Sequence, residues 1–486
     1  MAHIPITILE QDPPLSGLTL ENQGKVRDTH SLSGRNDLML VRATKRVSAF
    51  DFVLPALILL KGEILTAMNH FWVTQVLGSF FKTDLVACGA EIDAFLEERY
   101  RGNVDLQKSG TIVKRFTSPK KEDIIRFALT GSALKDYLRT GEVCGHRLSP
   151  GLIDGNMLPT PLYTPSTKAA VGHDMNISVY DIIAEYGPKQ EHWLLMMAGM
   201  MHQYARSKGI LLADMKVETY EDILIDEKGT PDCCRFWDII AWEKAQAKRK
   251  LPPSLDKQFV REECKRLGID KLDPKNSADL AIVDKLTFDE HVCHMTTRIY
   301  RYIFWRLTGM QIEVYQHAKM GIDVRARRPK IEILLGSESD LPQIEDGLSY
   351  LRNNADFRVH VISCHRNPDL LRQFAENRQD GADLVIAGAG KSAQLPGVLK
   401  SWLCYYKRPE IPVVGVAFES KSEQADRAAI DAIEELPSQP VELDPAGHAY
   451  FGSKGFYDAC VAAVEHEFLP KAFEPKPAKF NICQNS

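Results

Sequence analysis

Three carboxylates and a guanidinium surround one short turn at residues 224–238, whose sequence is LIDEKGTPDCCRFWD. Gly and Pro make a turn at 228–231 inexpensive, because Gly allows positive φ and Pro presets φ. The apolar residues on both sides make the segment read as a hairpin tip. A turn by itself does not require Asp226, Glu227, Asp232 and Arg235, and this raises the question of what they bind.

Two other motifs place charges where they could act together. In ADMKVE (213–218), Asp214, Lys216 and Glu218 alternate on an expected strand and therefore share one face. That face is either a charged site or a salt-bridged surface. In LDKQFVRE (255–262), Lys257 and Arg261 stand one helical turn apart, which suits an anion clamp or a plain exposed helix face.

Further polar candidates are spread over the first half of the chain. GKVRD (24–28) has a glycine that lets backbone approach a ligand, followed by Lys25 and Arg27. It suits a polyphosphate, although a solvated basic turn has the same composition. The other candidates are Ser48 and Asp51 after a strand, Arg126 and Ser132 around a glycine, and Lys168 and Asp174 in the loop at 164–178.

The elements that must position these residues change character along the chain. Up to about residue 320 strands and helices mix irregularly, with strands in 37–54 and 110–116 and an antiparallel pair at 210–218 and 222–226. Helical spacing of apolar residues predicts one long helix from about 284 to 315. The basic, unpatterned segment 319–330 is a predicted linker.

After the linker, apolar strands alternate with helices, which predicts a parallel sheet with helices on both faces. Ligands of such sheets bind at the carboxyl ends of strands. His365 follows the second strand; beside Arg366 it is a candidate for chemistry, and a structural histidine is the alternative. The other strand-end candidates are Gly336, Ser337, Ser339, Asp340, Ser363, Gly390 and Lys391.

Composition excludes several classes of protein. The 486 residues are 44% hydrophobic and 26% charged, with a net charge of −5, which argues against a general nucleic-acid binder. No secretory signal is visible, and the longest apolar stretch is too short to span a bilayer. The ten scattered cysteines fit reduced thiols in a cytoplasmic protein better than a metal site at Cys233-Cys234 or at 291–294.

In order, the motifs GKVRD, SAFD, KGEILT, LTGSALKDY, TPSTKA, HDMNIS, ADMKVE, TPDCCRFW and DKQF resemble the SAICAR synthetase family over roughly residues 20–317. The resemblance implies an α+β, ATP-grasp-like domain that uses ATP and Mg²⁺. It joins L-aspartate to carboxyaminoimidazole ribotide (CAIR) through an acyl phosphate. Metal and cations must neutralise the charge that gathers in this transition state.

The resemblance also implies roles for individual residues. The opening segment would bring a metal ligand, Asp226, beside Arg235, which binds an acidic substrate. Cys233-Cys234 and Met175 depart from the family pattern and leave the aspartate contacts open. The implied sets are Gly24, Lys25, Arg27 and Glu218 for ATP; Glu218 and Asp226 for Mg²⁺; Asp214, Lys216 and Asp232 in catalysis; and Ser48, Asp51, Arg126, Ser132, Lys168, Asp174, Arg235, Lys257 and Arg261 for CAIR and aspartate.

The strand-end motifs of the second part resemble the AIR carboxylase and N5-CAIR mutase family over about residues 330–470. This implies a flavodoxin-like, doubly wound domain without a cofactor that makes CAIR, with His365 moving a proton and the other strand-end residues holding the ribotide. HRNP and LPG lean to the mutase branch, whereas Lys391-Ser392 are closer to the CO₂-using branch. Gln394 replaces a mutase histidine.

The sequence therefore predicts a SAICAR synthetase domain at 1–318, a linker at 319–330, a carboxylase or mutase domain at 331–475 and a tail at 476–486. Small molecules (CAIR, L-aspartate, AIR or N5-CAIR, and CO₂) are the expected partners, with neither nucleic acid nor membrane, in a homo-oligomer such as an octamer. In one alternative the second domain is a catalytically inactive oligomerisation scaffold. A kinase-like phosphotransferase is a distant third, and no HRD or DFG motif supports it.

Overall fold

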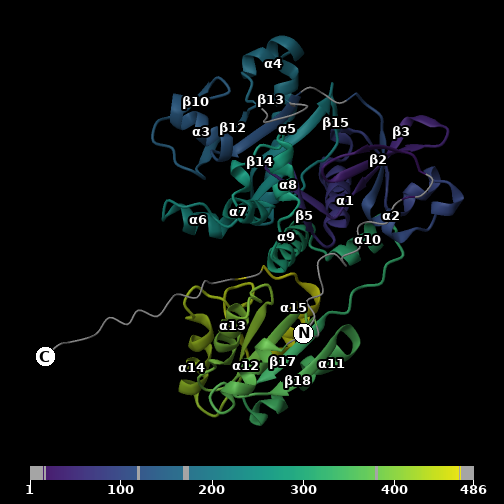
Figure 1. Ribbon diagram of the computed structural model, residues 1–486. Helices are drawn as coiled ribbons and strands as arrows, with labels where there is room; N and C mark the ends of the chain where they lie inside the picture. The colour runs from purple at the N-terminus through teal and green to yellow at the C-terminus, as the bar shows by residue number, and fades with distance from the viewer. Residues whose placement is uncertain are drawn as a thin grey trace. The chain divides into compact units, whose positions relative to one another are not determined.

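The chain divides into two compact units, Met1–Arg325 and Ala326–Ser486. The computed structural model describes residues 15, 18–117, 121–167, 175–377, 381–469 and 471 (Figure 1). Residues 321–329, in the expected linker, form neither helix nor strand. In the described part of the chain, no helix is both long enough and apolar enough to cross a membrane.

An antiparallel sheet of five strands, in the order β1-β2-β3-β8-β7, forms one side of the first unit. The strands expected in 37–54 and 110–116 are present: the first segment contains most of β3, all of β4 and the start of β5, and the second contains all of β8. The bounds are Leu20–Gln23 (β1), Arg27–Leu32 (β2), Arg35–Ala43 (β3), Leu85–Cys88 (β7) and Gly110–Lys114 (β8), with the separate pair Arg46–Ala49 (β4) and Phe52–Leu57 (β5).

A seven-stranded sheet contains the long strand β14, Ile210–Tyr220, near its centre. The order along the main path is β12-β9-β14-β15-β6, with β13 paired to β9 and β16 paired to β14. The expected antiparallel pair is confirmed as β14 and β15. The other bounds are Lys82–Thr83 (β6), Lys121–Ala128 (β9), Met157–Tyr163 (β12), Ser166–Thr167 (β13), Ile223–Ile225 (β15) and Cys234–Asp238 (β16).

Residues 224–238 are not the tip of a hairpin. Both flanking strands, β15 and β16, pair with β14 and not with each other. Ile225 lies opposite Glu218, and Cys234 lies opposite Met215 on the same edge of β14. The chain therefore leaves this edge at residue 226, makes an excursion over 226–233 and returns to the same edge. Local sequence could not show this, because the shared partner strand lies upstream.

Helices pack against both sheets, and the long helix expected over 284–315 is two helices. Asp289 caps α9 by accepting a hydrogen bond from the His291 N–H, and Gly309, with φ 73°, ends it in the left-handed conformation that terminates helices. The bounds are Lys61–Phe71 (α1), Val104–Ser109 (α2), Gly131–Thr140 (α3), Val179–Tyr186 (α4), Pro188–Ser207 (α5), Ile239–Gln246 (α6), Gln258–Arg266 (α7), Ser277–Val283 (α8), Glu290–Thr308 (α9) and Ile312–Met320 (α10).

The second unit contains the parallel sheet that the sequence predicts, in the order β18-β17-β19-β20-β21. This order is that of flavodoxin-like doubly wound sheets, whose switch point lies between the first and third strands, here β17 and β19. The strands are Lys330–Leu335 (β17), Asp356–Val361 (β18), Leu384–Ala389 (β19), Val413–Ala417 (β20) and Tyr450–Phe451 (β21); the helices are Glu345–Asn354 (α11), Pro368–Glu376 (α12), Leu395–Tyr405 (α13), Glu423–Glu434 (α14) and Gly452–Glu465 (α15).

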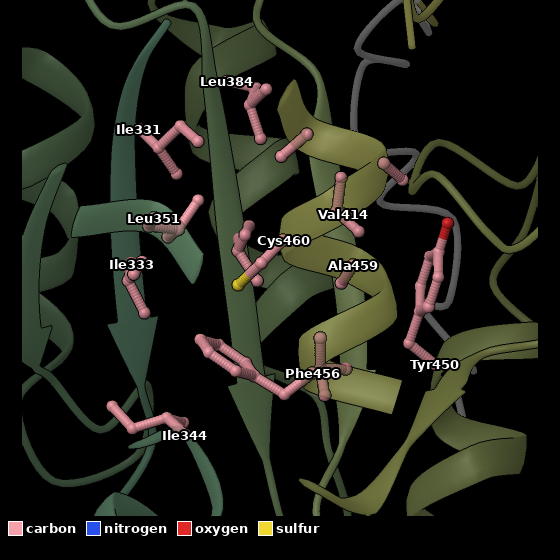
Figure 2. Close-up of a cluster of buried hydrophobic side chains, with 14 of the residues drawn as sticks. Ile331, Ile333, Ile344, Leu351, Leu384, Val414, Tyr450, Phe456, Ala459 and Cys460 are labelled. Carbon is pink, nitrogen blue, oxygen red and sulfur yellow. The ribbon is translucent and has the colours of Figure 1, made fainter. Parts of the chain in front are cut away.

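Each face of this sheet is covered by a separate apolar core. On one face, Phe456 and Cys460 of α15 pack on Ile333 and Val414 of the sheet (Figure 2). On the other face, α12 and α13 cover Leu334 and its neighbours. Helices on both faces leave the carboxyl edge of the strands as the place for polar loops.

The excursion over 226–233 yields a stability prediction at Gly229. Its φ is +66°, and an added Cβ would overlap the Trp72 indole and come within 2.5 Å of the Met201 methyl group. Backbone strain and overpacking each cost roughly 1–3 kcal/mol, so Gly229→Ala should destabilise the first unit by about 2–5 kcal/mol. Urea-dependent hydrogen exchange of peptides from the first unit measures this loss separately from the second unit.

Gly34→Ala is the matched control. Gly34 has nearly the same φ, +72°, but a Cβ there would meet nothing within 4 Å. Only the left-handed strain of about 1–2 kcal/mol should then appear. Equal losses in the two variants would contradict the packing argument at Gly229.

Candidate active site

Strand β14 carries the charged face that its sequence predicts. Half-buried Lys216 and Glu218 alternate with buried Met215 and Val217. Asp214 and Lys216 line one pocket, and Glu218 lines another. The charged face of β14 is therefore neither part of the core nor a plain solvent-exposed surface. It contributes side chains to two neighbouring pockets.

The first pocket lies between the two sheets of the first unit and is called here the apolar-walled pocket. Its walls come from β3 and β8 on one side and from β14 and β15 on the other, and three of its carboxylates, Glu218, Asp226 and Glu227, come from β14 and the segment after β15. Its lining is Arg27, Met39, Val41, Ala43, Leu65, Thr66, Asn69, Asp84, Thr111, Val113, Lys114, Phe116, Glu218, Ile225, Asp226 and Glu227.

Arg27 neutralises the acidic side of the apolar-walled pocket. Its guanidinium binds Asp226 with both terminal nitrogens, at 2.6 and 2.7 Å, and lies 3.5 Å from Glu227. Burial opposes its charge, but Asp226 and Glu227 outweigh this and raise the pKa of Arg27. Arg27 thus pairs with Asp226 and Glu227 in a pocket whose lining also includes Asp84, Lys114 and Glu218.

Buried contacts hold the excursion over 226–233 in place. The Asp84 carboxylate accepts a hydrogen bond from the Asp226 N–H at 2.9 Å and forms a buried ion pair with Lys228. The Trp72 indole N–H donates to the Gly229 carbonyl at 2.7 Å. These contacts direct Asp226 into the apolar-walled pocket.

The other residues that the resemblance assigned near the N-terminus lie outside both pockets. Lys25 forms an exposed ion pair with Asp51 at 2.6 Å. The N–H of Gly24 donates to the Arg27 carbonyl at 2.8 Å, so Gly24 shapes the turn that leads into β2. Ser48 lies on β4. None of Gly24, Lys25, Ser48 and Asp51 is among the described residues that line the two pockets.

The second pocket is rich in cations and is called here the basic pocket. Five cationic side chains face three carboxylates, so an anionic ligand is favoured. Eight of the residues that the sequence singled out meet there although they lie up to 135 positions apart. The lining is Glu122, Ile124, Arg126, Ser132, Asp214, Met215, Lys216, Asp232, Cys233, Cys234, Arg235, Lys257 and Arg261.

Asp214 joins two guanidinium groups across the basic pocket. Its Oδ2 lies 3.1 Å from Arg126 and 2.7 Å from Arg235. Arg126 also donates to the Ser132 hydroxyl at 3.0 Å. The nearby Arg235 guanidinium explains why this motif has a glycine at position 131, because a Cβ there would stand 2.9 Å from it. Arg126 also donates from Nε to the Thr164 hydroxyl at 2.9 Å, so these contacts fix the orientation of both arginines in the pocket wall.

Lys216 is held by Glu122, which the sequence analysis did not single out. The Nζ of Lys216 lies 2.6 Å from Glu122 Oε1. Burial opposes the charged form, but Glu122 outweighs it and raises the pKa of Lys216. Lys216 is therefore positively charged. It lies on β14 between the basic pocket and Glu218 of the apolar-walled pocket.

Asp232 is tied into the structure beneath the basic pocket. It forms a buried ion pair with Lys61 at 2.8 Å and accepts a hydrogen bond from the Tyr300 hydroxyl at 2.6 Å. Burial lowers the pKa of Lys257, and Asp232 only partly offsets this. The contacts of Asp232 are those of a residue that supports the pocket, and its assignment to catalysis has no direct support in them.

Arg261 is positioned by a buried carboxylate at the start of α7. Asp256 lies 3.9 Å from the Arg261 guanidinium and accepts a hydrogen bond from the Gln258 N–H at 2.7 Å. Lys257 and Arg261 both line the basic pocket, and the anion clamp stays a prediction. Lys168 and Asp174 lie outside the described residues.

Sequence reasoning missed five residues that build these pockets. KGEILT and LDKQF were visible as motifs, but nothing local indicated that Lys61 and Asp256 pair with residues of the site, and the segment that contains Glu122 gave no motif. Tyr300 gave no signal, because it lies within the apolar pattern of a helix. The five are Lys61, Asp84, Glu122, Asp256 and Tyr300.

In the second unit, the predicted residues gather at the carboxyl ends of β17, β18 and β19. The segment after β17 begins a 3-10 turn at Glu338–Gln343 and not an α-helix, and Ser337 caps it. Arg366, after β18, donates to the Gly336 carbonyl at 3.3 Å and its N–H donates to the Ser363 hydroxyl at 3.2 Å. The loops of the first two strands thus contact each other.

His365 and Asp340 are the chemically distinctive residues of this edge. The Nε2 of His365 lies 3.0 Å from Oε1 of Gln394, which follows β19. Asp340 is buried, its Oδ2 has no hydrogen-bond partner in the part of the chain that the structure describes, and burial raises its pKa. Gly390 and Lys391 follow β19 directly, and Lys391 has a φ of 58°.

Known proteins match both units. The SAICAR synthetase family matches residues 20–274, and the AIR carboxylase family matches residues 330–443. The phosphoribosylaminoimidazole-succinocarboxamide synthase of Pasteurella multocida is 38% identical over 276 residues, which cover 54% of this chain and 91% of that protein. The enzyme of the same name from Thioalkalivibrio sulfidiphilus is 37% identical over 309 residues, covering 61% of this chain and 96% of its own length.

A solved structure agrees with the fold of the first unit. The SAICAR synthase of Saccharomyces cerevisiae, complexed with SAICAR, has a TM-score of 0.52 and 28% identity, and the match covers 62% of this chain and 98% of that chain. Sequence, fold and family matches thus agree over the unit that contains both pockets. This chain belongs to the SAICAR synthetase family of purine-biosynthesis ligases, and its second unit carries a domain of the AIR carboxylase family.

Proposed function

We propose that the first unit joins L-aspartate to CAIR at the expense of ATP, through an acyl phosphate. One observation carries the proposal: Lys216 in the basic pocket and Glu218 in the apolar-walled pocket are two positions apart on one face of β14. A phosphoryl donor in one pocket and an anionic acceptor in the other would meet at this strand. Positioning of this kind is the main requirement of phosphoryl transfer.

The apolar-walled pocket suits ATP. Its aliphatic and aromatic walls fit a base, and its acidic end fits the metal that accompanies the phosphates. Because the walls come from both sheets, the nucleotide would lie between them, as in an ATP-grasp-like domain. Arg27, now paired with Asp226, would turn to the phosphates.

Glu218 and Asp226 fit the magnesium ion of Mg·ATP. Both supply hard oxygen atoms, and a cation, the Arg27 guanidinium, already compensates Asp226. No group of three or more His, Cys, Asp or Glu side chains among the described residues could hold a metal. Mg²⁺ in such enzymes typically uses one or two carboxylates together with substrate phosphates. When bound, the ion would neutralise the charge of the phosphates.

The basic pocket suits the ribotide. CAIR carries a phosphate and a carboxylate, and Arg126, Arg235 and Arg261 offer paired donors for such groups. The related yeast structure is described as a complex with SAICAR, the product of this reaction. Lys168 and Asp174 stay proposed contacts of the substrates on the resemblance alone.

The proposed reaction has two steps. A carboxylate oxygen of CAIR attacks the γ-phosphorus, the bond to the β-phosphate oxygen breaks, and ADP leaves. The amine of aspartate then attacks the acyl carbon, loses a proton and expels phosphate, which leaves an amide. Lys216 would stabilise the negative charge on the transferred group, and Asp214 would hold Arg126 and Arg235 toward the substrate.

For the second unit we propose formation of CAIR, from AIR and CO₂ or from N5-CAIR. His365 would exchange the proton of the imidazole carbon, because an imidazole side chain can both accept and donate a proton. The residues around the ends of β17 and β18 would hold the ribotide. The alternative is an inactive unit that serves as an oligomerisation scaffold, and it rests on Gln394, which replaces the mutase histidine and lies 3.0 Å from Nε2 of His365.

Loss of either carboxylate should abolish the ligase. Glu218→Ala or Asp226→Ala would leave phosphate charge uncompensated and cost several kcal/mol of transition-state stabilisation. The measurement is aspartate-dependent ADP release at ordinary Mg²⁺. Asp222→Ala is the control, because Asp222 pairs with Lys82 on the surface just after β14. Near-normal turnover in either pocket variant would refute the role of that residue.

Arg235→Ala should weaken binding of an acidic substrate. A charge-assisted hydrogen bond contributes roughly 1.5–3 kcal/mol, so the saturation curve for CAIR or aspartate should shift about tenfold or more. Arg266→Ala, which removes an exposed arginine of α7 paired with Glu263, should leave both curves in place. If Arg235→Ala leaves both curves unchanged, Arg235 does not bind substrate.

His365→Asn should eliminate CAIR formation and spare ligase activity on supplied CAIR. Asparagine keeps polarity and approximate size but cannot exchange a proton at neutral pH. Both activities are measured on one preparation, with exposed His448→Asn as the control. If the unaltered protein forms no CAIR from either precursor, the scaffold alternative holds. If His365→Asn still forms CAIR, the histidine is structural.

A further inference from the structure

Two adjacent thiols stand in the basic pocket. The Sγ atoms of Cys233 and Cys234 are 3.7 Å apart, and both residues line the pocket together with its cations. Cys233 is partly exposed, whereas Cys234 is buried and burial raises the pKa of its thiol. Cys233 is therefore the thiol that a small reagent entering the pocket meets first, with a second thiol in contact behind it.

We propose that Cys233 and Cys234 form a reversible redox-modification site in the substrate pocket, with a hydroperoxide as the oxidant. The Cys233 thiolate attacks one peroxide oxygen, the O–O bond breaks, and Cys233 becomes a sulfenic acid. The Cys234 sulfur then attacks the Cys233 sulfur, and the hydroxyl group leaves as water with the Cys234 proton. With hydrogen peroxide, two thiols are oxidised to one disulfide and the peroxide is reduced to two molecules of water.

The disulfide would be easily reduced again. The Cα atoms of adjacent residues are about 3.8 Å apart, whereas disulfides usually join Cα atoms about 4.4–6.8 Å apart. Strain of this kind makes a disulfide more reducible, and strained or exposed disulfides are the labile, regulatory ones. A permanent structural cross-link is therefore not expected here.

Backbone contacts link the pair to both pockets. The Cys233 carbonyl accepts a hydrogen bond from the Lys216 N–H at 2.9 Å. The N–H groups of Cys233 and Cys234 donate to the Thr230 carbonyl at 3.1 and 2.9 Å, and the Thr230 hydroxyl donates to Glu227 of the apolar-walled pocket. Closing a ring that contains the 233–234 peptide must rotate that peptide. Oxidation should thus disturb Lys216 on one side and Glu227 on the other, and suppress the ligase.

The chemistry of the site does not depend on the proposed function, but the loss of ligase activity rests on it. The test therefore has two readouts. The full chain is treated with limited hydrogen peroxide, free thiols are blocked, and trypsin releases peptide 229–235, which contains both cysteines. Its mass should fall by two hydrogens, saturating CAIR should slow this change, and dithiothreitol should reverse it. ADP release should fall and recover in parallel.

Single variants separate the two steps. In Cys234→Ser, the sulfenic acid of Cys233 should accumulate and be trapped by dimedone on peptide 229–235. In Cys233→Ser, this peptide should form neither the disulfide nor the dimedone adduct. Each variant is compared with its own reduced form. Cys144 and Cys364, which are also partly exposed, report general oxidation in the same digests.

Three results would each contradict one part of the proposal. If peptide 229–235 keeps both thiols while Cys144 or Cys364 is oxidised, the proposed site is wrong. If the disulfide forms and ADP release is unchanged, the coupling through Lys216 and Glu227 is wrong. If the disulfide forms but the reduced protein has no ligase activity, the modification site stands and the proposed function fails.

Discussion

The register of strand β14 is the constraint on which the first unit depends. β14 is hydrogen-bonded to β9 along one edge and to β15 and β16 along the other. A slip of one residue would exchange its two faces. Lys216 and Glu218 would then enter the core, where an unpaired charge is costly, and Met215 and Val217 would leave it. Because the strand is fixed on both sides, the two pockets stay aligned along one charged face.

Charge pairing within the two pockets is the second determinant of the site. Arg27 compensates Asp226 in the apolar-walled pocket, and Glu122 compensates Lys216 in the basic pocket. These pairs are partly exposed, and partly exposed ion pairs contribute little to stability. In the proposed reaction, substrate phosphates and carboxylates would therefore replace them at low cost. The groups that pair with one another here would then be available to a ligand.

In the second unit, strand order places the candidate site, and a few side chains determine its chemistry. Strand order alone places the loops after β17, β18 and β19 at one edge, as in other doubly wound sheets. Whether that edge is catalytic depends on a few side chains. His365 contacts Gln394, and Asp340 is buried with one oxygen unpartnered among the described residues. These two features bear directly on whether the unit forms CAIR or serves as a scaffold.

The sequence by itself determined which residues share a face and where the architecture changes. Alternation on β14 placed Lys216 and Glu218 together, and strand–helix alternation predicted the parallel sheet of the second unit, because both patterns are local. It did not predict the excursion over 226–233 or the pairing of Glu122 with Lys216 and of Lys61 with Asp232. Only the tertiary structure decided these, since a charge is paired by whichever distant segment folds beside it, and periodicity along the chain carries no information about that neighbour.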